Sequence, residues 1–210
     1  MKKIVRTVGM LIVLVSGLSA QKIEVSPFYG YFRPVATGLG SLQSTARDSH
    51  TKLTPGSGAG ARVTWNTKGY YGVELGYSQS KLGFETAIRP SGATADVIRT
   101  DKVKVQQGFL NFLAYFMPAG ERFRPFITGG VQLQQYGRPV IDDFDIPGTR
   151  NYGANYGGGL KIKLFKHALI RIDLRDYIGG KPYDLTREDE RNTGGRQRQL
   201  EGSVGLAITF

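Results

Sequence analysis

The sequence alternates between apolar and polar residues over most of its length, and helical periodicity is rare. The clearest example is IRIDLRDY at 170–177, where Ile170, Ile172 and Leu174 occupy every second position beside charged residues. Successive side chains of a β-strand point to opposite faces, so a period of two predicts a strand with one apolar and one charged face. The fold then depends on which of these two faces lies inside.

The same alternation predicts eight strands of roughly ten residues. They cover approximately 22–32, 60–66, 70–78, 103–116, 124–136, 151–164, 170–177 and 199–210. No helical segment separates them, so consecutive strands must pair antiparallel. The fourth segment has the least regular phase, because aromatic and aliphatic residues occupy both of its faces.

The connections between these strands alternate in length. Short links such as NTKG, PAGER and FKH follow the second, fourth and sixth strands, and longer links rich in Gly, Ser, Thr and charge follow the others. All short turns therefore lie at one end of the sheet and all long loops at the other, as in outer-membrane barrels. The pattern predicts an all-β fold, an eight-stranded antiparallel up-and-down transmembrane β-barrel.

The distribution of charge between the two faces indicates which face is inside. One face is aliphatic and aromatic with almost no charge, while the other combines charged residues with Gly, Ser and Thr. An eight-stranded barrel leaves an interior that side chains just fill, and a Lys or Arg on the lipid face costs about 2–4 kcal/mol at the bilayer midplane. We therefore expect the charged face to line the lumen. A water-soluble, lipocalin-like barrel with an apolar interior is the alternative.

The charged residues of the lumen face are expected to form a polar network, because buried ions persist only when they are paired and hydrogen-bonded. We expect each carboxylate of this network to be bridged by at least one of its cations across the barrel, with surplus cations near a wet end. The predicted members are Arg62, Glu74, Lys161, Lys163, Arg171, Asp173, Arg175 and Glu201.

Aromatic residues are expected to mark the two membrane interfaces, where amphipathic rings are favoured. Beside the short turns these residues are Trp65, Tyr71, Tyr115 and Phe116, together with Tyr70, Phe126 and Phe165. Beside the long loops they are Tyr29, Tyr31, Tyr77 and Tyr152, together with Tyr136 and Tyr177.

Residues 1–20 have the three-part layout of a secretory signal, with cations, an apolar run over 8–15 and a small-residue end. That run is shorter than the roughly 20 residues needed to span a bilayer. We expect cleavage before Gln21 and one barrel domain over 21–210. The absence of Cys excludes disulfides, thiolate metal sites and a lipoprotein anchor.

These features resemble the small eight-stranded outer-membrane β-barrels of the OmpA transmembrane domain, OmpX and opacity-protein type, over the whole of 21–210. The final VGLAITF sets Val204, Leu206, Ile208 and Phe210 in one phase. This end is similar to the sorting signal by which the barrel-assembly machinery recognises that family. The resemblance implies a monomer in the outer membrane of a Gram-negative-type bacterium, reached after secretion to the periplasm.

The resemblance further implies a structural and surface-interaction role: membrane integrity, adhesion or host contact through four extracellular loops. A narrow passive pore is an alternative, although eight strands leave little open lumen. A lipid A-modifying enzyme at the barrel rim is a further alternative. Asp48, Ser49 and His50 adjoin in the first long loop, but these are also ordinary loop residues. His167 lies in a short turn, so the two histidines cannot share a site.

Other candidate chemistry is weaker. Asp142, Asp143 and Asp145 could hold Ca²⁺, yet a solvated loop face explains them more simply. GANYGGG precedes no helix and is therefore not a phosphate loop. The net charge is +11, and the basic run RNTGGRQR fits contact with lipopolysaccharide phosphates better than nucleic acid. We expect no enzyme activity, cofactor or metal; the expected partners are outer-membrane lipid, lipopolysaccharide and an extracellular ligand at the loops.

Overall fold

The described part of the computed structural model consists of β-strands and their connections, without a helix. It comprises residues 22–35, 39, 51–67, 69–88, 94–95, 97–141, 144–183 and 196–210. None of these residues belongs to a helix long and apolar enough to cross a membrane. The expected signal segment 1–20 lies outside the described residues, so its cleavage stays a prediction.

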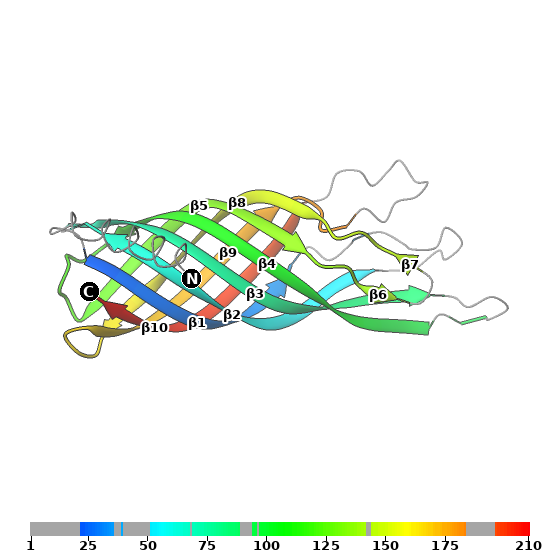
Figure 1. Cartoon of the computed structure of the whole chain (residues 1–210), viewed down its shortest axis with the longest axis horizontal. Helices are drawn as coiled ribbons and strands as arrows, with labels where there is room; N and C mark the ends of the chain where they lie inside the picture. The colour runs from blue at the N-terminus through cyan, green and yellow to red at the C-terminus, as the bar shows by residue number, and fades with distance from the viewer. Residues whose placement is uncertain are drawn as a thin grey trace, which may run out of the picture.

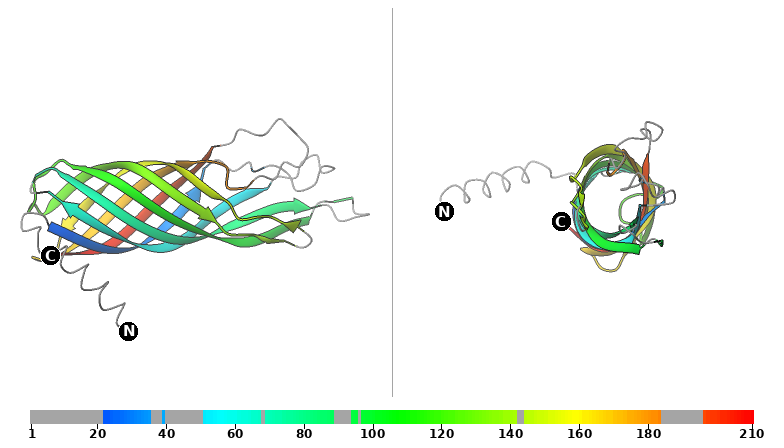
Figure 2. Two further views of the ribbon diagram at one scale, coloured as in Figure 1. Left: turned by 45° about the horizontal axis from the view of Figure 1, so that its top comes forward. Right: turned by 90° about the vertical axis from the view of Figure 1, so that its right-hand side faces the viewer.

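Eight long strands form a closed barrel, in which every strand pairs antiparallel with its neighbours and β1 pairs with β10 (Figures 1 and 2). The strands are β1 (Lys22–Pro34), β2 (Lys52–Asn66), β3 (Tyr71–Ile88), β4 (Val97–Tyr115), β5 (Phe123–Tyr136), β8 (Arg150–Lys163), β9 (Ala168–Gly179) and β10 (Gln197–Thr209). Their order around the ring is β1-β10-β9-β8-β5-β4-β3-β2. The predicted eight-stranded antiparallel barrel is confirmed, and its ring is closed, although residues 97–104 of β4 pair with β3 alone.

Two ends of the barrel differ as predicted. Short turns join β2 to β3, β4 to β5 and β8 to β9 at the end where the barrel's own first and last strands also terminate (Figure 1). The connection from β5 to β8, at the opposite end, contains a small hairpin of β6 (Val140–Ile141) and β7 (Phe144–Asp145). We call these the short-turn end and the long-loop end.

Three strands extend further toward the long loops than the alternation predicted. β2 begins at Lys52 instead of near 60, β3 continues to Ile88 instead of ending near 78, and β4 begins at Val97 instead of near 103. In Figure 1 these strands project beyond the rest of the wall at the right. The expected boundaries were wrong because the apolar and polar faces exchange places along these strands.

The exchange of faces is plain on the neighbouring strands β3 and β4. Up to Tyr77, the outward side chains of β3 are apolar; from Gln79 they are polar, and from Leu82 the inward side chains become apolar. On β4, Gln106 begins the polar outward positions and is the register partner of Gln79. A wall in hydrocarbon needs an apolar exterior, whereas a wall in water needs an apolar interior. The barrel therefore leaves the hydrocarbon between Tyr77 and Gln79.

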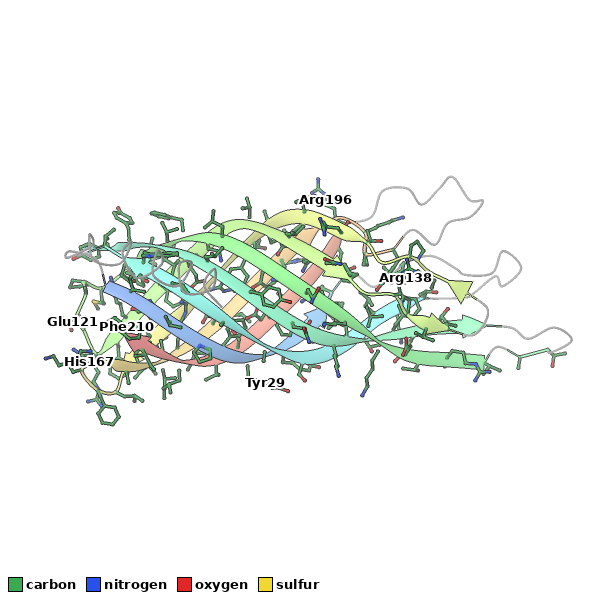
Figure 3. The ribbon with its side chains drawn as sticks, in the orientation of Figure 1. Tyr29, Glu121, Arg138, His167, Arg196 and Phe210 are labelled. Atoms are coloured by element: carbon green, nitrogen blue, oxygen red, sulfur yellow. The ribbon has the colours of Figure 1, made fainter. Side chains whose placement is uncertain are left out.

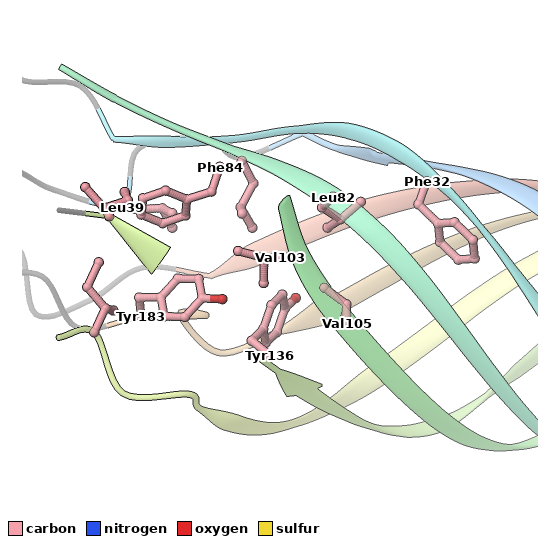
Figure 4. Close-up of a cluster of buried hydrophobic side chains, with 11 residues drawn as sticks. Phe32, Leu39, Leu82, Phe84, Val103, Val105, Tyr136 and Tyr183 are labelled. Carbon is pink, nitrogen blue, oxygen red and sulfur yellow. The ribbon is translucent and has the colours of Figure 1, made fainter. Parts of the chain in front are cut away.

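Above this level an apolar cluster fills the barrel, which we call the outer plug (Figure 4). It consists of Phe32, Leu39, Leu53, Leu82, Phe84, Val103, Val105, Tyr136, Ile141, Ile146 and Tyr183. The Tyr183 ring packs edge-on against Phe84, with centroids 5.6 Å apart, and its hydroxyl donates to the Gly137 carbonyl at 2.6 Å. Burial raises the pKa of the Tyr183 phenol, so this hydroxyl remains a donor.

Below that level, inward glycines make room for large rings. Phe28, Phe109 and Phe126 each face a glycine on the neighbouring strand. The three register pairs are Phe28 with Gly60, Phe109 with Gly76 and Phe126 with Gly159. A methyl group at Gly76 would lie only 2.2 Å from Phe109 Cζ. These rings therefore pack directly against the backbone of the lumen-facing glycines.

We expect Gly76→Ala to destabilise the barrel by about 1–3 kcal/mol, because the added methyl group overpacks a filled interior. Gly108→Ala is the matched control, since Gly108 faces outward and nothing lies within 4 Å of its missing Cβ. The measurement is the urea midpoint of unfolding in lipid vesicles, followed on gels. Equal midpoints for the two variants would contradict the packing of Phe109 on Gly76.

Candidate functional site

A cluster of paired charges occupies the lumen within the membrane-spanning part, and we call it the ionic core. Its members come from β2, β3, β9 and β10, and all are buried. They are Arg62, Glu74, Arg171, Asp173, Arg175 and Glu201. The strand alternation positions them, because inward residues recur at every second place on each strand.

Asp173 is the central acceptor of the ionic core. Arg171 donates to both of its oxygens, from Nε at 3.0 Å and from Nη2 at 2.9 Å. Arg175 Nη2 donates at 3.0 Å, and Arg62 Nη1 forms a further ion pair with Asp173 Oδ2. Three guanidinium groups therefore converge on one carboxylate, which gives it charge-assisted bonds on both oxygens.

Glu74 ties the two opposite walls of the barrel together. It lies on β3, four strands around the ring from β9, which carries its partners. Arg175 Nη2 donates to Glu74 Oε1 at 2.6 Å, and Arg171 Nη1 pairs with Oε2. The hydroxyl of Thr64 donates to Oε2 at 3.0 Å. These bonds cross the full width of the lumen.

Glu201 completes the balance of charge. Its Oε1 accepts from Arg62 Nη2 at 3.3 Å and its Oε2 accepts from the Tyr177 hydroxyl at 2.7 Å. Arg62 Nη2 also donates to the Ser203 hydroxyl at 2.7 Å. The core thus contains three guanidinium groups and three carboxylates. Each carboxylate is bridged by at least one cation, as the sequence predicted.

Each arginine of the ionic core also stacks on one of the rings that cover a glycine. Arg62 lies 3.8 Å above the Phe28 ring, Arg171 lies 4.7 Å above Phe126 and Arg175 lies 4.9 Å above Phe109. Guanidinium groups are attracted to ring faces, most strongly where both are desolvated. Glycine, phenylalanine and arginine are therefore layered three times around the lumen, and the rings hold the guanidinium groups in place.

A second ion pair lies nearer the short-turn end. Lys161 pairs with Glu24, and its Nζ also donates to the Tyr115 hydroxyl at 2.8 Å. Sequence reasoning missed Glu24, although the alternation of β1 gives it the same inward phase as Ser26 and Phe28. With Glu24, Lys161 is no longer a surplus cation.

Lys163 was wrongly assigned to the lumen network. It ends β8 at the short-turn end, is exposed, and its Nζ donates to the Gly120 carbonyl at 3.4 Å. Arg124 is the inward cation at this end that sequence reasoning did not name. Its Nη2 donates to the Gly69 carbonyl at 2.9 Å, and its guanidinium lies 3.5 Å above the Tyr115 ring. Surplus positive charge does lie at a wet end, on the exposed Lys163 itself and on Arg124.

Most of the predicted interface aromatics point outward. Tyr29, Tyr31, Tyr71, Tyr77, Phe116 and Tyr152 are exposed, and Trp65 is partly exposed. Tyr115 is a correction, because it is 4% exposed and points into the lumen. Phe126, Tyr136 and Tyr177 are corrections for the same reason. Strand phase decides the face of an aromatic residue, and its nearness to a strand end does not.

The C-terminal strand carries its predicted apolar face outward. Val204, Leu206, Ile208 and Phe210 are all exposed on the wall. Figure 3 shows Phe210 and His167 together at the short-turn end, and His167 Nδ1 lies 3.1 Å from the Thr209 carbonyl oxygen. Recognition of this end by an assembly machinery stays a prediction.

The other candidate chemistry falls mostly outside the described residues. Asp48, Ser49, His50, Asp142 and Asp143 are among the residues that are not described, and nothing is described of the Asp145 side chain. Within the described ranges, no group of three or more His, Asp or Glu side chains is arranged to hold a metal ion. The ionic core itself presents paired, buried ions, so its chemistry is that of a fixed cross-link between strands.

We expect Asp173→Ala to lower the stability of the barrel by about 3–5 kcal/mol, since it leaves three buried guanidinium groups without their shared acceptor. The midpoint of thermal unfolding in detergent measures this. Glu85→Ala is the control, because Glu85 pairs with Lys52 at 2.9 Å on the exposed surface, where a pair contributes about 0–1 kcal/mol. An unchanged midpoint for Asp173→Ala would show that the lumen is hydrated and the pairs carry little energy.

No protein-family model and no curated protein matches the sequence. Solved structures do match. The outer membrane protein OprG from Pseudomonas aeruginosa is 14% identical with a TM-score of 0.64, covering 91% of this chain and 96% of that chain. The N-terminal β-barrel domain of OprF from the same organism is 16% identical with a TM-score of 0.52, covering 90% and 97%. Ail, the attachment invasion locus protein of Yersinia pestis, is 11% identical with a TM-score of 0.54, covering 91% and 99%. The chain therefore has the fold of the small eight-stranded outer-membrane β-barrels.

Proposed function

We propose that the protein is an integral protein of the outer membrane of a Gram-negative-type bacterium, with a structural and surface-interaction role. It strengthens the membrane and presents its four long loops for adhesion or host contact. The observation that carries this proposal is the filled lumen. Two chemically different layers occupy the interior: the ionic core within the membrane and the outer plug beyond it.

A filled lumen favours this role over that of a pore. Glu74 accepts from two arginines on the opposite wall, so ion pairs span the lumen at this level. The outer plug adds a dry layer whose members Phe32, Leu82 and Val103 have no measurable exposure. Solute passage would require both layers to move. The outer wall and the two ends of the barrel remain accessible.

The outer-wall surfaces support membrane residence. Leu75, Phe112, Ile127 and Leu174 are large apolar side chains that are at least half exposed. A continuous apolar wall of this kind is favourable against acyl chains and unfavourable against water. Among structures with this fold, Ail bears the name attachment invasion locus protein and was solved with the heparin analogue sucrose octasulfate. That complex belongs to Ail and is an example of contact made by a barrel with this fold.

We expect the folded protein to migrate faster than the boiled protein on a detergent gel of an outer-membrane fraction, because a closed barrel resists detergent until heated. In planar bilayers we expect no steady conductance, because both layers of the lumen are closed. A wide porin in the same bilayer is the positive control. Steady open-channel current from the purified protein would contradict the structural role in favour of a pore.

The structural role and the surface-interaction role can be tested separately in a deletion strain that is complemented with different variants. We expect the full chain and a variant with residues 184–195 replaced by a short Gly-Ser turn to restore the barrier against a large antibiotic equally. Only the full chain should restore attachment to host cells or matrix. If neither form affects permeability or attachment, both halves of the proposal are wrong.

A further inference from the structure

Three lysines stand on the outer wall just beyond the level at which the barrel leaves the hydrocarbon. They are Lys81 on β3 and Lys102 and Lys104 on β4, and we call them the lysine triad. All three are exposed and occupy the outward phase of their strands. They follow directly on Gln79 and Gln106, the register pair that begins the polar part of the wall.

The triad brings like charges together. Lys81 and Lys104 are register partners on adjacent strands, and Lys102 is the next outward residue beyond Lys104. Residues directly opposite have Cβ atoms about 4.5–5.5 Å apart, and like charges there destabilise a sheet. No ion pair between described residues includes a member of the triad. The nearby Glu85 is engaged with Lys52 at 2.9 Å.

The level of the triad relative to the bilayer follows from the strands. Lys81 lies four residues beyond Tyr77, which is about 13 Å along a strand and about 10 Å along the axis at a tilt of about 40°. A bilayer has about 5–8 Å of headgroup region on each side of its hydrocarbon core. The Cα atoms of Lys81 and Lys104 therefore lie about 2–5 Å beyond that region, and their long side chains can reach back into it.

We infer that the lysine triad binds the phosphate groups of lipopolysaccharide in the outer leaflet beside the barrel. This inference rests on the proposed outer-membrane location. A phosphate between Lys81 and Lys104 would accept from both ammonium groups and turn their mutual repulsion into a shared attraction. The triad faces sideways from the wall, so its ligand lies next to the barrel in the plane of the membrane. A phosphorylated lipid of the outer leaflet carries the phosphate and lies in the required position beside the barrel.

The test is titration of bis-phosphorylated lipid A into the refolded protein in detergent micelles, with the bound fraction counted by native mass spectrometry. A lysine near an anionic lipid surface contributes about five-fold in affinity. We expect Lys81→Gln/Lys104→Gln to bind about 25-fold more weakly, and Lys81→Arg/Lys104→Arg to bind as the parent does. Lipid A stripped of its phosphates should bind the parent as weakly as the Gln variant binds lipid A.

The matched control is Lys163→Gln/Lys166→Gln, which removes the same charge at the short-turn end and should leave the affinity unchanged. Undiminished binding by Lys81→Gln/Lys104→Gln would overturn the inference. So would equal binding of dephosphorylated lipid A, or displacement of lipid A by inorganic phosphate at the same phosphate concentration, which would indicate a general anion site. Gel mobility before and after boiling reports barrel formation separately. If the double variant does not fold, each single Gln variant should lose about five-fold.

Discussion

The absence of water around the middle of the barrel is the constraint on which the rest of the structure depends. No backbone group facing hydrocarbon can bond to solvent, so β1 must close on β10 and every outward side chain there must be apolar. The charged side chains of the same strands must therefore face the lumen. They are gathered in a lumen too narrow for bulk water, and the alternation along each strand is the direct result. Where the wall emerges into water, beyond Tyr77, the same constraint acts in the opposite direction and the apolar side chains turn inward.

Burying charge in this way is favourable only with complete partners, because desolvation of an ion costs several kcal/mol. The ionic core approaches that condition: each of its three arginines pairs with at least one of its three carboxylates, and the Nε atoms of Arg62 and Arg175 are left without a hydrogen-bond partner. The phenylalanine rings under the arginines also stabilise the ionic core, because they hold the guanidinium groups in position. Phe28, Phe109 and Phe126 each need an opposite glycine, and each then holds one guanidinium group at a fixed height. The glycines of the lumen face therefore position the arginines indirectly: each glycine makes room for a phenylalanine ring, and that ring packs against a guanidinium group. A fixed set of pairs also favours one relative level of β3 and β9, which lie on opposite walls, over other levels; the selection of one arrangement is the best supported benefit of buried ions.

Much of this could be predicted from the sequence, because period-two alternation fixes both the strands and their faces. The eight strands, the outward apolar wall and the bridging of Glu74, Asp173 and Glu201 all follow from it. The failures have physical causes. Tyr115 and Phe126 were assigned by nearness to a turn, although strand phase puts both inside. Glu24 went unnoticed because the inward positions that follow it on β1 are uncharged, so the sequence shows no cluster of charge there. The extensions of β2, β3 and β4 were missed because the prediction assumed apolar outward and polar inward side chains throughout. That pattern holds for a wall in hydrocarbon and reverses for a wall in water.

The two closures of the lumen act on different principles, and this difference shapes what the protein can do. The ionic core closes a segment surrounded by lipid, where only paired ions could stabilise polar side chains. The outer plug closes a segment surrounded by water, where burial of apolar surface is the available driving force. Neither closure could replace the other. Within the membrane, strands with apolar side chains on both faces would gain nothing from turning one face inward. Among the described residues, side chains fill the lumen at these two levels and leave little room there for a ligand. We therefore expect recognition on the outside of the barrel, at the headgroup level and at the long-loop end, where the lysine triad and the extended strands lie.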